Sequence, residues 1–76
     1  MQIDVELFGD LRGLSKNGAK FELEVDESMT IGGLLAEIGV QDKDSWSAAI
    51  NGEVAYADSP LVASAKVIIF PPIAGG

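Results

Sequence analysis

The sequence contains no cysteine and no histidine among its 76 residues. Without cysteine there can be no disulfide bond, no thiolate nucleophile and no zinc ribbon. Without histidine there is no Ser-His catalytic triad, and no imidazole that could act as a base or as a metal ligand. These two absences exclude several of the commonest forms of nucleophilic and metal-dependent chemistry.

Basic residues are scarce as well. Five lysines and arginines stand against twelve aspartates and glutamates, which gives a net charge of −7. This charge should repel nucleic acid phosphates, so we expect no nucleic-acid partner. It favours solubility, with steering toward a basic partner as the alternative.

Long apolar runs are also missing. None approaches the roughly 18 residues of a membrane span, so no membrane partner is expected. The N-terminal residues 1–6 lack the basic and apolar regions of a secretory signal. At this length we expect one small domain, located in the cytoplasm.

Two segments in the first third of the chain predict strands. In residues 3–8 and 21–26 every second residue is apolar, and most residues between them are acidic. A period of two is typical of strands with one buried face. A glycine-rich connection over residues 9–18 joins the two segments and favours a hairpin.

Residues 31–38 predict a short amphipathic helix. Its apolar residues recur at i, i+3, i+4 and i+7 and so share one face: Ile31, Leu34, Leu35 and Ile38. Ser28 or Thr30 can cap the first turn, because a side-chain oxygen accepts from its free N–H groups. Gly39 tolerates the positive φ with which many helices end. Nothing in the sequence explains Gly32 and Gly33 in the first turn, where each costs about 1 kcal/mol relative to alanine.

The second half of the chain predicts a hairpin and a buried strand. Asn51-Gly52 lies between apolar residues and favours a tight turn, because both turn positions require φ > 0. Residues 65–70 are mostly apolar, which is typical of a central strand covered on both faces. The order is therefore two strands, one helix and two or three further strands. This order predicts an α+β fold with the helix on one face of a sheet.

The C-terminal segment is the strongest functional signal. It reads Pro71-Pro72-Ile73-Ala74-Gly75-Gly76. The two prolines lack N–H donors and fix φ near −65°, so the last strand cannot continue and the tail should leave as a stiff stem. Six residues reach roughly 20 Å, and glycines carry no side chain that would obstruct a narrow channel. We therefore expect a domain, residues 1–70, and a tail, residues 71–76, that presents the Gly76 carboxylate to an active site elsewhere. The alternative is an inert, frayed terminus, which the apolar stem disfavours.

Four segments resemble the MoaD/ThiS family of ubiquitin-like sulfur carriers, and the MoaD branch most closely. Residues 7–14 are similar to its "FF…LREL" stretch, and residues 30–35 resemble its capped helix. Residues 49–54 match its "VNGE" hairpin. Residues 69–76 resemble the ending "FPPVxGG", the most specific of the four. Together they cover nearly the whole chain in the family's order.

The resemblance implies a β-grasp fold, a mixed sheet of four to five strands with one main helix on one face. It also implies a chemistry in which an ATP-dependent enzyme of the ubiquitin-activating type adenylates Gly76. A sulfur donor then converts the acyl-adenylate to a thiocarboxylate. The chain itself would bind no metal and no cofactor, since ATP is used by the activating enzyme.

In the MoaD branch such a chain is the small subunit of molybdopterin synthase. The resemblance implies that the large subunit supplies the catalytic groups and that sulfur passes to a pterin precursor of the molybdenum cofactor. The chain would then be the non-catalytic, sulfur-donating subunit. The tail residues implied to insert into the partner are Pro71, Pro72, Ile73, Ala74 and Gly75.

Other interpretations stay open at this point. Within the family, the carrier could serve thiamine thiazole synthesis or tungsten-cofactor assembly. From other classes, the chain could be a ubiquitin-like modifier joined through Gly76 to a target lysine, or an interaction domain with an inert tail. Pro71-Pro72 favours the molybdopterin branch, whereas a modifier would use the same two terminal glycines.

Strand parity predicts a surface for the partner. Phe8 falls on the acidic face of the first strand, and Phe70 on the face of Lys66. Large apolar residues on a charged face indicate a contact patch. The alternative is that both rings cover the ends of the sheet or turn inward. The resemblance adds Leu61 to the interface, and Arg12 is either a partner contact or an ordinary solvated charge.

Overall fold

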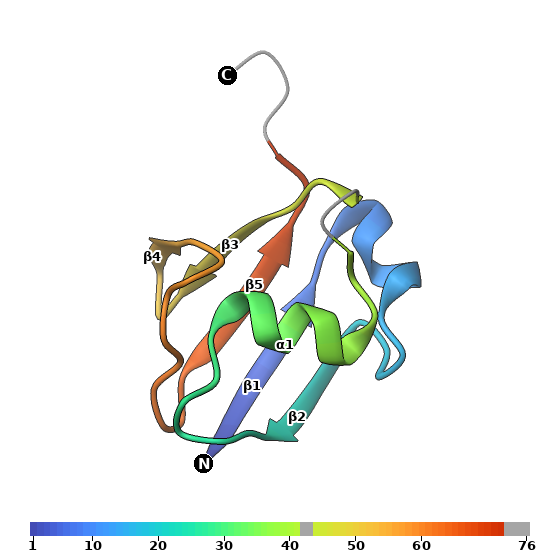
Figure 1. Ribbon diagram of the computed structural model, residues 1–76. Helices are drawn as coiled ribbons and strands as arrows, with labels where there is room; N and C mark the ends of the chain where they lie inside the picture. Colours follow the sequence, from blue (N-terminus) through green and yellow to red (C-terminus); the bar gives the residue numbers. More distant parts are fainter. Residues whose placement is uncertain (42–43, 73–76) are drawn as a thin grey trace.

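The computed structural model describes residues 1–41 and 44–72 (Figure 1). In this part of the chain the elements are β1 (Gln2–Leu7), the 3-10 helix η1 (Gly9–Leu14), β2 (Lys20–Glu24), α1 (Ile31–Ile38), β3 (Ser47–Ile50), β4 (Glu53–Ala55) and β5 (Lys66–Phe70). The α+β class and the single main helix are as predicted. η1 lies inside the glycine-rich connection, where the sequence predicts no helix. Neither helix is long and apolar enough to cross a membrane.

The five strands form one mixed sheet in the order β2-β1-β5-β3-β4. β1 and β5 are parallel, and the other neighbouring strands are antiparallel. β5 therefore lies in the middle, between the hairpins β1–β2 and β3–β4 (Figure 1). Because β1 and β5 are parallel, both end at the same edge of the sheet, where Leu7 lies beside Ile69.

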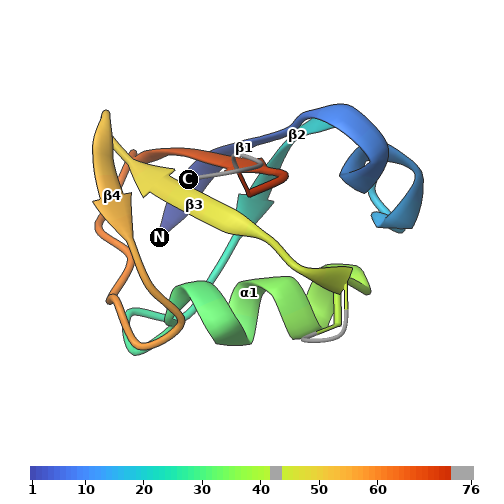
Figure 2. The ribbon, with the colours of Figure 1, turned by 90° about the horizontal axis from the view of Figure 1, so that it is seen from above.

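The sheet has a covered face and an open face. Figure 2 shows α1 beneath one face and no element of the described chain over the other. In β5, Val67 and Ile69 are buried toward α1, whereas Ile68 and Phe70 on the open face are partly exposed. The central position predicted for this strand is confirmed, but the prediction that both its faces are covered is wrong. The described part of the chain has one main helix, and that helix covers a single face of the sheet.

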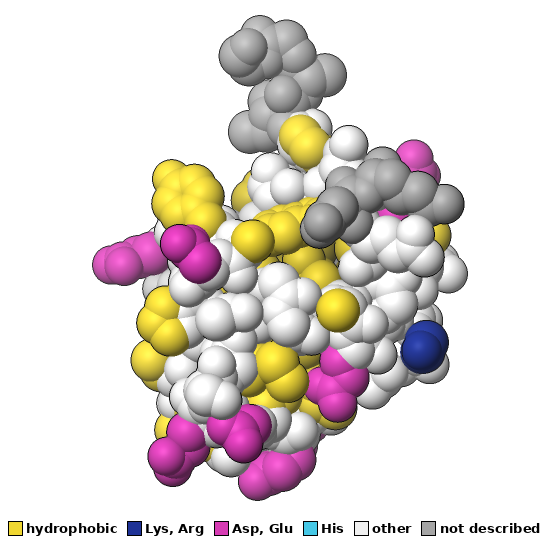
Figure 3. Space-filling model, viewed as in Figure 1, with side chains coloured by type: hydrophobic (Ala, Val, Ile, Leu, Met, Phe, Trp, Pro, Cys, Tyr) yellow, Lys and Arg dark blue, Asp and Glu magenta, His cyan; other side chains and the backbone are white. Residues whose placement is uncertain are grey.

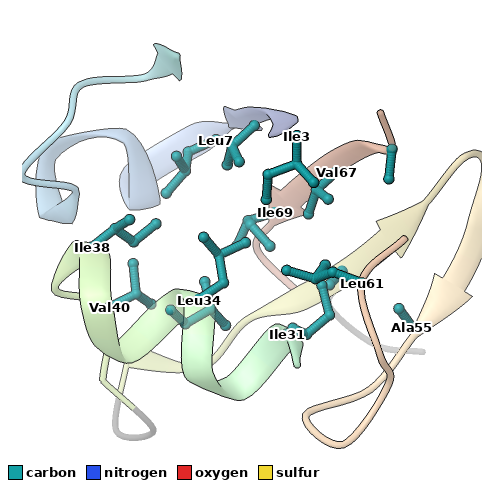
Figure 4. Packing of buried hydrophobic residues seen from close by; sticks show 14 of the residues in the cluster. Ile3, Leu7, Ile31, Leu34, Ile38, Val40, Ala55, Leu61, Val67 and Ile69 are labelled. Atoms are coloured by element: carbon teal, nitrogen blue, oxygen red, sulfur yellow. The ribbon is translucent and has the colours of Figure 1, made fainter. Parts of the chain in front are cut away.

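The core lies between α1 and the covered face. The four apolar stripe residues predicted for the helix are at most 2% exposed. In Figure 4, the helix residues Ile31, Leu34 and Ile38 face the inward side chains of β1 and β5. These inward side chains include Ile3, Leu7, Val67 and Ile69. Full burial of a large apolar side chain contributes roughly 1.5–3 kcal/mol. This packing fixes the two central strands from which the candidate site is built.

α1 begins and ends at the residues that the sequence predicts. Thr30 is the N-cap, since its Oγ1 accepts a hydrogen bond of 3.2 Å from the Gly33 N–H. Gly39 ends the helix with a φ of 102°, and its N–H donates to the Leu35 carbonyl at 3.0 Å. Ser28, the other candidate cap, belongs to the preceding turn.

A neighbouring backbone segment explains Gly32 in the first turn of α1, whereas Gly33 faces the flexible side chain of Met29. The Gly32 N–H donates to the Ala57 carbonyl at 2.8 Å. A Cβ on Gly32 would lie 3.1 Å from that oxygen, and one on Gly33 would lie 2.7 Å from the Met29 Sδ. The segment after β4 thus approaches Gly32 through its backbone and leaves little room for a side chain there, whereas the Met29 side chain could move away from a Cβ on residue 33.

The hairpin between β3 and β4 is confirmed. Asn51 and Gly52 have φ of 51° and 85°, as a tight turn with two left-handed positions requires. The Asn51 Oδ1 accepts from the Lys66 N–H at 2.9 Å, and the Asn51 N–H donates to the Lys66 carbonyl at 2.8 Å. These two bonds join the turn to the start of β5.

Candidate functional site

The candidate site is the edge of the sheet at which β1 and β5 end. Beyond the Leu7–Ile69 pair, the Phe8 N–H donates to the Ile69 carbonyl at 2.9 Å. β5 ends at Phe70, and Pro71 and Pro72 follow as exposed residues outside any strand. Proline has no N–H to extend the ladder, which accounts for the end of the strand. The tail therefore starts from a strand pair held at the centre of the sheet.

The predicted reactive group, the carboxylate of Gly76, lies outside the described residues. The same holds for Ile73, Ala74 and Gly75. The roles predicted for them, and for Pro71-Pro72 as a stem inserted into a partner, stay predictions. What the structure describes is the platform from which the tail departs.

An apolar patch lies on the open face beside the start of the tail. It is formed by one residue of β4, two of β5 and the residue after β1, and we call it the open-face patch: Val54, Ile68, Phe70 and Phe8. Phe8 is 41% exposed and Val54 is 71% exposed, while the other two are partly exposed. The prediction that Phe8 and Phe70 are partly exposed in the free protein is confirmed.

Sheet register brings the members of this patch together. Phe8 follows the Leu7–Ile69 pair and so lies next to Phe70. Ile68 pairs with Ala49, which in turn pairs with Val54 on the edge strand. Val54 is absent from the sequence-based prediction. Its signal was nonetheless present, because the Asn51-Gly52 turn fixes which residues of β3 and β4 face each other.

Charged residues border the open-face patch. Asp4 pairs with Glu22 of β2 on one side and with Lys66 of β5 on the other. A shallow hollow of about 590 Å³ adjoins the patch and is lined by Glu6, Phe8, Asn51, Gly52, Lys66 and Ile68. An apolar, partly aromatic centre with a charged rim is typical of protein–protein contacts.

The helix-bearing side of the molecule differs from the open face in its charge. Figure 3 shows acidic side chains spread over this side, with few basic ones among them. This agrees with the net charge of −7. A surface of one sign steers partners of the opposite sign and is screened by salt. The charge thus favours partners with basic surfaces.

Leu61 does not belong to the exposed surface, and its assignment to a partner interface is corrected. It is 3% exposed and is a member of the core cluster. Its N–H donates to the Met29 carbonyl at 3.0 Å, and Thr30 and Pro60 form a bridge beside it. Figure 4 shows its side chain next to Ile31 of α1. The segment between β4 and β5 thus runs past the start of the helix and turns Leu61 inward.

Arg12 is exposed and lies in η1. Its Nε donates to the Gly9 carbonyl at 3.0 Å, so the guanidinium is anchored to the turn that follows β1. Exposure leaves the other donors of the group accessible to a partner. The predicted partner contact of Arg12 stays a prediction.

One contact at this edge has no counterpart in the sequence-based prediction. Gly9 has a φ of 60°, and a Cβ placed on it would lie 2.7 Å from the Cγ of Pro71. The first residue of η1 and the first residue of the tail therefore lie against each other. No local sequence pattern signals this contact, because the two residues are far apart in the chain.

Among the residues that the structure describes, the ionisable group with a clear pKa shift is Asp26, at the opposite edge of the sheet. Hydrogen bonds from the Ser28 N–H and hydroxyl, at 2.8 Å and 2.7 Å, hold the pKa of Asp26 below its ordinary value of 3.8. Asp26 follows Val25, whose N–H donates to the Met1 carbonyl at the beginning of β1. Over residues 1–41 and 44–72, no three acidic side chains are grouped so that they could hold a metal ion.

The mixed five-stranded sheet, with one helix on one face and a central last strand, is a ubiquitin-like β-grasp fold. Residues 5–76 match the ThiS family, and the chain belongs to this family. No curated protein matches the sequence as a relative.

Solved structures with the same fold include three of interest here. SAMP1 from Haloferax volcanii has a TM-score of 0.72 and 23% identity, with 100% of both chains covered. A putative molybdopterin converting factor, subunit 1, from Pyrococcus furiosus has a TM-score of 0.75 and 23% identity, covering 96% of this chain and 99% of that one. A complex of subunits 1 and 2 of the molybdopterin-converting factor from Helicobacter pylori contains a chain with a TM-score of 0.66, 19% identity and 100% coverage of both chains. At these identities the likeness establishes the fold.

Proposed function

We propose that this chain is a sulfur carrier that acts through the carboxylate of Gly76. The observation that carries the proposal is that the central strand ends at Phe70, beside an exposed apolar patch, at the point where the sequence continues as Pro-Pro-Ile-Ala-Gly-Gly. A partner that covers the open-face patch would receive the tail at the same time. Membership in the ThiS family supports this proposal.

The proposed chemistry begins with activation, because a carboxylate is a poor electrophile until it bears a good leaving group. An activating enzyme of the ubiquitin-activating type supplies ATP. A carboxylate oxygen of Gly76 attacks the α-phosphorus, pyrophosphate leaves, and an acyl-adenylate forms. Sulfur at the oxidation level of sulfide, delivered by a sulfur donor, then attacks the acyl carbon. AMP departs with the bridging oxygen, and a thiocarboxylate remains on Gly76.

In this scheme the chain's own residues bind the partner and present the Gly76 carboxylate to it, and they do not catalyse the reaction. The two prolines stiffen the base of the tail, and the terminal glycines allow it to enter a narrow active site. The sequence offers no cysteine or histidine for the transfer steps. The catalytic groups and the ATP therefore come from the partners, and the chain needs no cofactor of its own.

For the pathway we propose molybdopterin synthesis in the cytoplasm, with the chain as the small, non-catalytic subunit of molybdopterin synthase. Pro71-Pro72 before the tail supports this branch. The similarity to the Pyrococcus furiosus and Helicobacter pylori proteins named above supports a large-subunit partner. Phe8 and Phe70 would contact that subunit, and the exposed Arg12 of η1 would donate to a partner carboxylate.

A second candidate is a ubiquitin-like modifier whose Gly76 becomes joined to a target lysine. The similarity to SAMP1, described also as a small archaeal modifier protein, favours it. The adenylation step would be the same in both cases, and only the acceptor of the activated glycine would differ. Family membership alone also leaves thiamine thiazole synthesis and tungsten-cofactor assembly as destinations of the sulfur.

The pathway can be tested with chain that carries a Gly76 thiocarboxylate from the start. The first mixture contains this chain, a molybdopterin synthase large subunit and the pterin precursor. The second contains the chain, thiazole synthase and its substrates. The third contains the chain, cell extract, activating enzyme and ATP. The proposal predicts sulfur transfer in the first mixture only, with loss of about 16 Da from the chain as sulfur is replaced by oxygen. Transfer in the second mixture, or lysine conjugates in the third without transfer in the first, would contradict it.

A further inference from the structure

Gly9 lies at the point where the tail separates from the rest of the domain. Because β1 and β5 are parallel, the chain segments that follow them leave the sheet at the same edge. β5 continues into Pro71, while β1 must turn aside into η1 after Phe8. Gly9 makes this turn with a φ of 60°, in the left-handed region that favours glycine.

The approach of Pro71 to Gly9 leaves no room for a side chain. A Cβ on Gly9 would lie 2.7 Å from the Pro71 Cγ and 3.2 Å from its Cδ. The shorter distance is about 0.7 Å below the 3.4 Å at which ordinary contact begins. An added methyl group would therefore displace one of the two residues.

Hydrogen bonds on both sides of Gly9 indicate which residue would move. The Phe8 N–H is held by the Ile69 carbonyl at 2.9 Å, and the Gly9 carbonyl accepts from the Arg12 Nε at 3.0 Å. Pro71 has no N–H, and it is exposed. Its ring would be displaced before the turn at Gly9 gave way.

We infer that Gly9 is a positioning residue for the tail: its missing side chain sets the direction in which Pro71 leaves the domain relative to the open-face patch. The functional consequence rests on the proposed function, in which one partner holds the patch and receives Gly76 in its active site. The stem spans at most roughly 20 Å, so a tilt at its base carries through to the reacting end. Misplacement of a reacting group by about 1 Å commonly costs on the order of a hundredfold in rate.

The chain offers two matched controls for a Gly9→Ala variant. Gly18 has a φ of 90° with no atom within 4 Å of a Cβ position, so Gly18→Ala reports the cost of a positive φ without a steric clash. Gly13 lies in η1, has no positive φ and has no such neighbour either, so Gly13→Ala reports the substitution alone. All three glycines are exposed.

The contact itself is tested by NMR on the free, full-length proteins. In the wild-type chain we expect a nuclear Overhauser effect between the Gly9 α-protons and the Pro71 ring. In Gly9→Ala we expect shifted Pro71 and Pro72 ring resonances, and in Gly13→Ala and Gly18→Ala we expect wild-type values. Unchanged proline resonances in Gly9→Ala would overturn the inference whatever the chain's function proves to be.

The functional consequence is tested by ATP–pyrophosphate exchange with the activating enzyme. Gly9→Ala should lower kcat by roughly tenfold or more while KM stays within about twofold, because the misplaced group is at the reacting end. Both control variants should behave as the wild type. In a Pro71→Ala background, which removes Cγ, Gly9→Ala should have little further effect.

The outcomes separate this inference from the proposed function. If the wild-type chain supports no exchange, the proposed function fails and the NMR comparison alone decides whether Gly9 positions the tail. If the wild type is active and Gly9→Ala matches Gly18→Ala, Gly9 does not position the tail. A loss that persists undiminished with Pro71→Ala would likewise overturn the inference, because it would then arise from backbone strain.

Discussion

Truncation of Phe8 tests whether the open-face patch is a contact surface. Phe8 is 41% exposed, and an aromatic side chain has roughly 200 Å² of surface, so about 80 Å² remains for a partner to cover. At about 25 cal/mol per Å² this corresponds to about 2 kcal/mol. Phe8→Ala should therefore weaken the complex by roughly thirtyfold.

The assay is titration calorimetry with the molybdopterin synthase large subunit, together with the melting temperature of each variant. Because Phe8 lies outside the core cluster, its truncation should leave the melting temperature near the wild-type value. Leu14→Ala is a matched control, since Leu14 is 39% exposed and its carbonyl lies beside Gly39 at the end of α1. It should bind like the wild type. Wild-type affinity for Phe8→Ala, or an equal loss for Leu14→Ala, would refute the assignment of the patch.

Two further predictions concern stability. Leu61→Ala should lower the free energy of unfolding by about 2–5 kcal/mol in denaturant titrations, because it leaves a cavity in the core. A change near zero would contradict the burial of Leu61. Asp26→Ala should destabilise the domain at neutral pH, because the hydrogen bonds from Ser28 favour the ionised carboxylate. Since the folded-state pKa lies below 3.8, this contribution is complete above that pH and is lost as the pH falls through the folded-state value. Melting curves of wild type and Asp26→Ala should therefore converge in acid, and a constant difference at all pH values would contradict the prediction.

Most of the secondary structure followed from the sequence because its causes are local. Alternation over residues 3–8 and 21–26 predicted β1 and β2, whose burial in the structure also alternates. Thr30 and Gly39 mark the two ends of α1, and each does so through a hydrogen bond within one turn of the helix. The Asn51-Gly52 turn requires only its own two φ angles. Signals of this kind lie within a few residues of the feature they predict.

The errors and omissions concern contacts between distant segments. Leu61 is buried because its segment runs past the start of α1, and no periodicity in residues 56–65 reports this path. Gly32 is explained by the carbonyl of Ala57, which lies in the segment after β4. In β5 the apolar run predicts two covered faces, but Ile68 is partly exposed on the open face. An apolar residue on an uncovered face resembles a core residue when only the sequence is known.

The candidate site was predictable in part. The end of β5 at Phe70 follows from residue types alone, since two consecutive prolines have no N–H groups with which to continue the ladder of a central strand. The exposure of Phe8 and Phe70 followed from strand parity. Val54 required the register across the hairpin, and the contact between Gly9 and Pro71 required the parallel pairing of β1 with β5.

The intact mass of the chain tests whether the Gly76 carboxylate becomes a thiocarboxylate. Full-length protein is incubated with its activating enzyme, ATP and a sulfur donor, beside samples that lack ATP or Gly76. Conversion to the thiocarboxylate should add about 16 Da, the excess of sulfur over oxygen, to the C-terminal peptide, and this gain should be absent from both controls. An unchanged mass, with an enzyme preparation that thiocarboxylates another carrier, would contradict the claim.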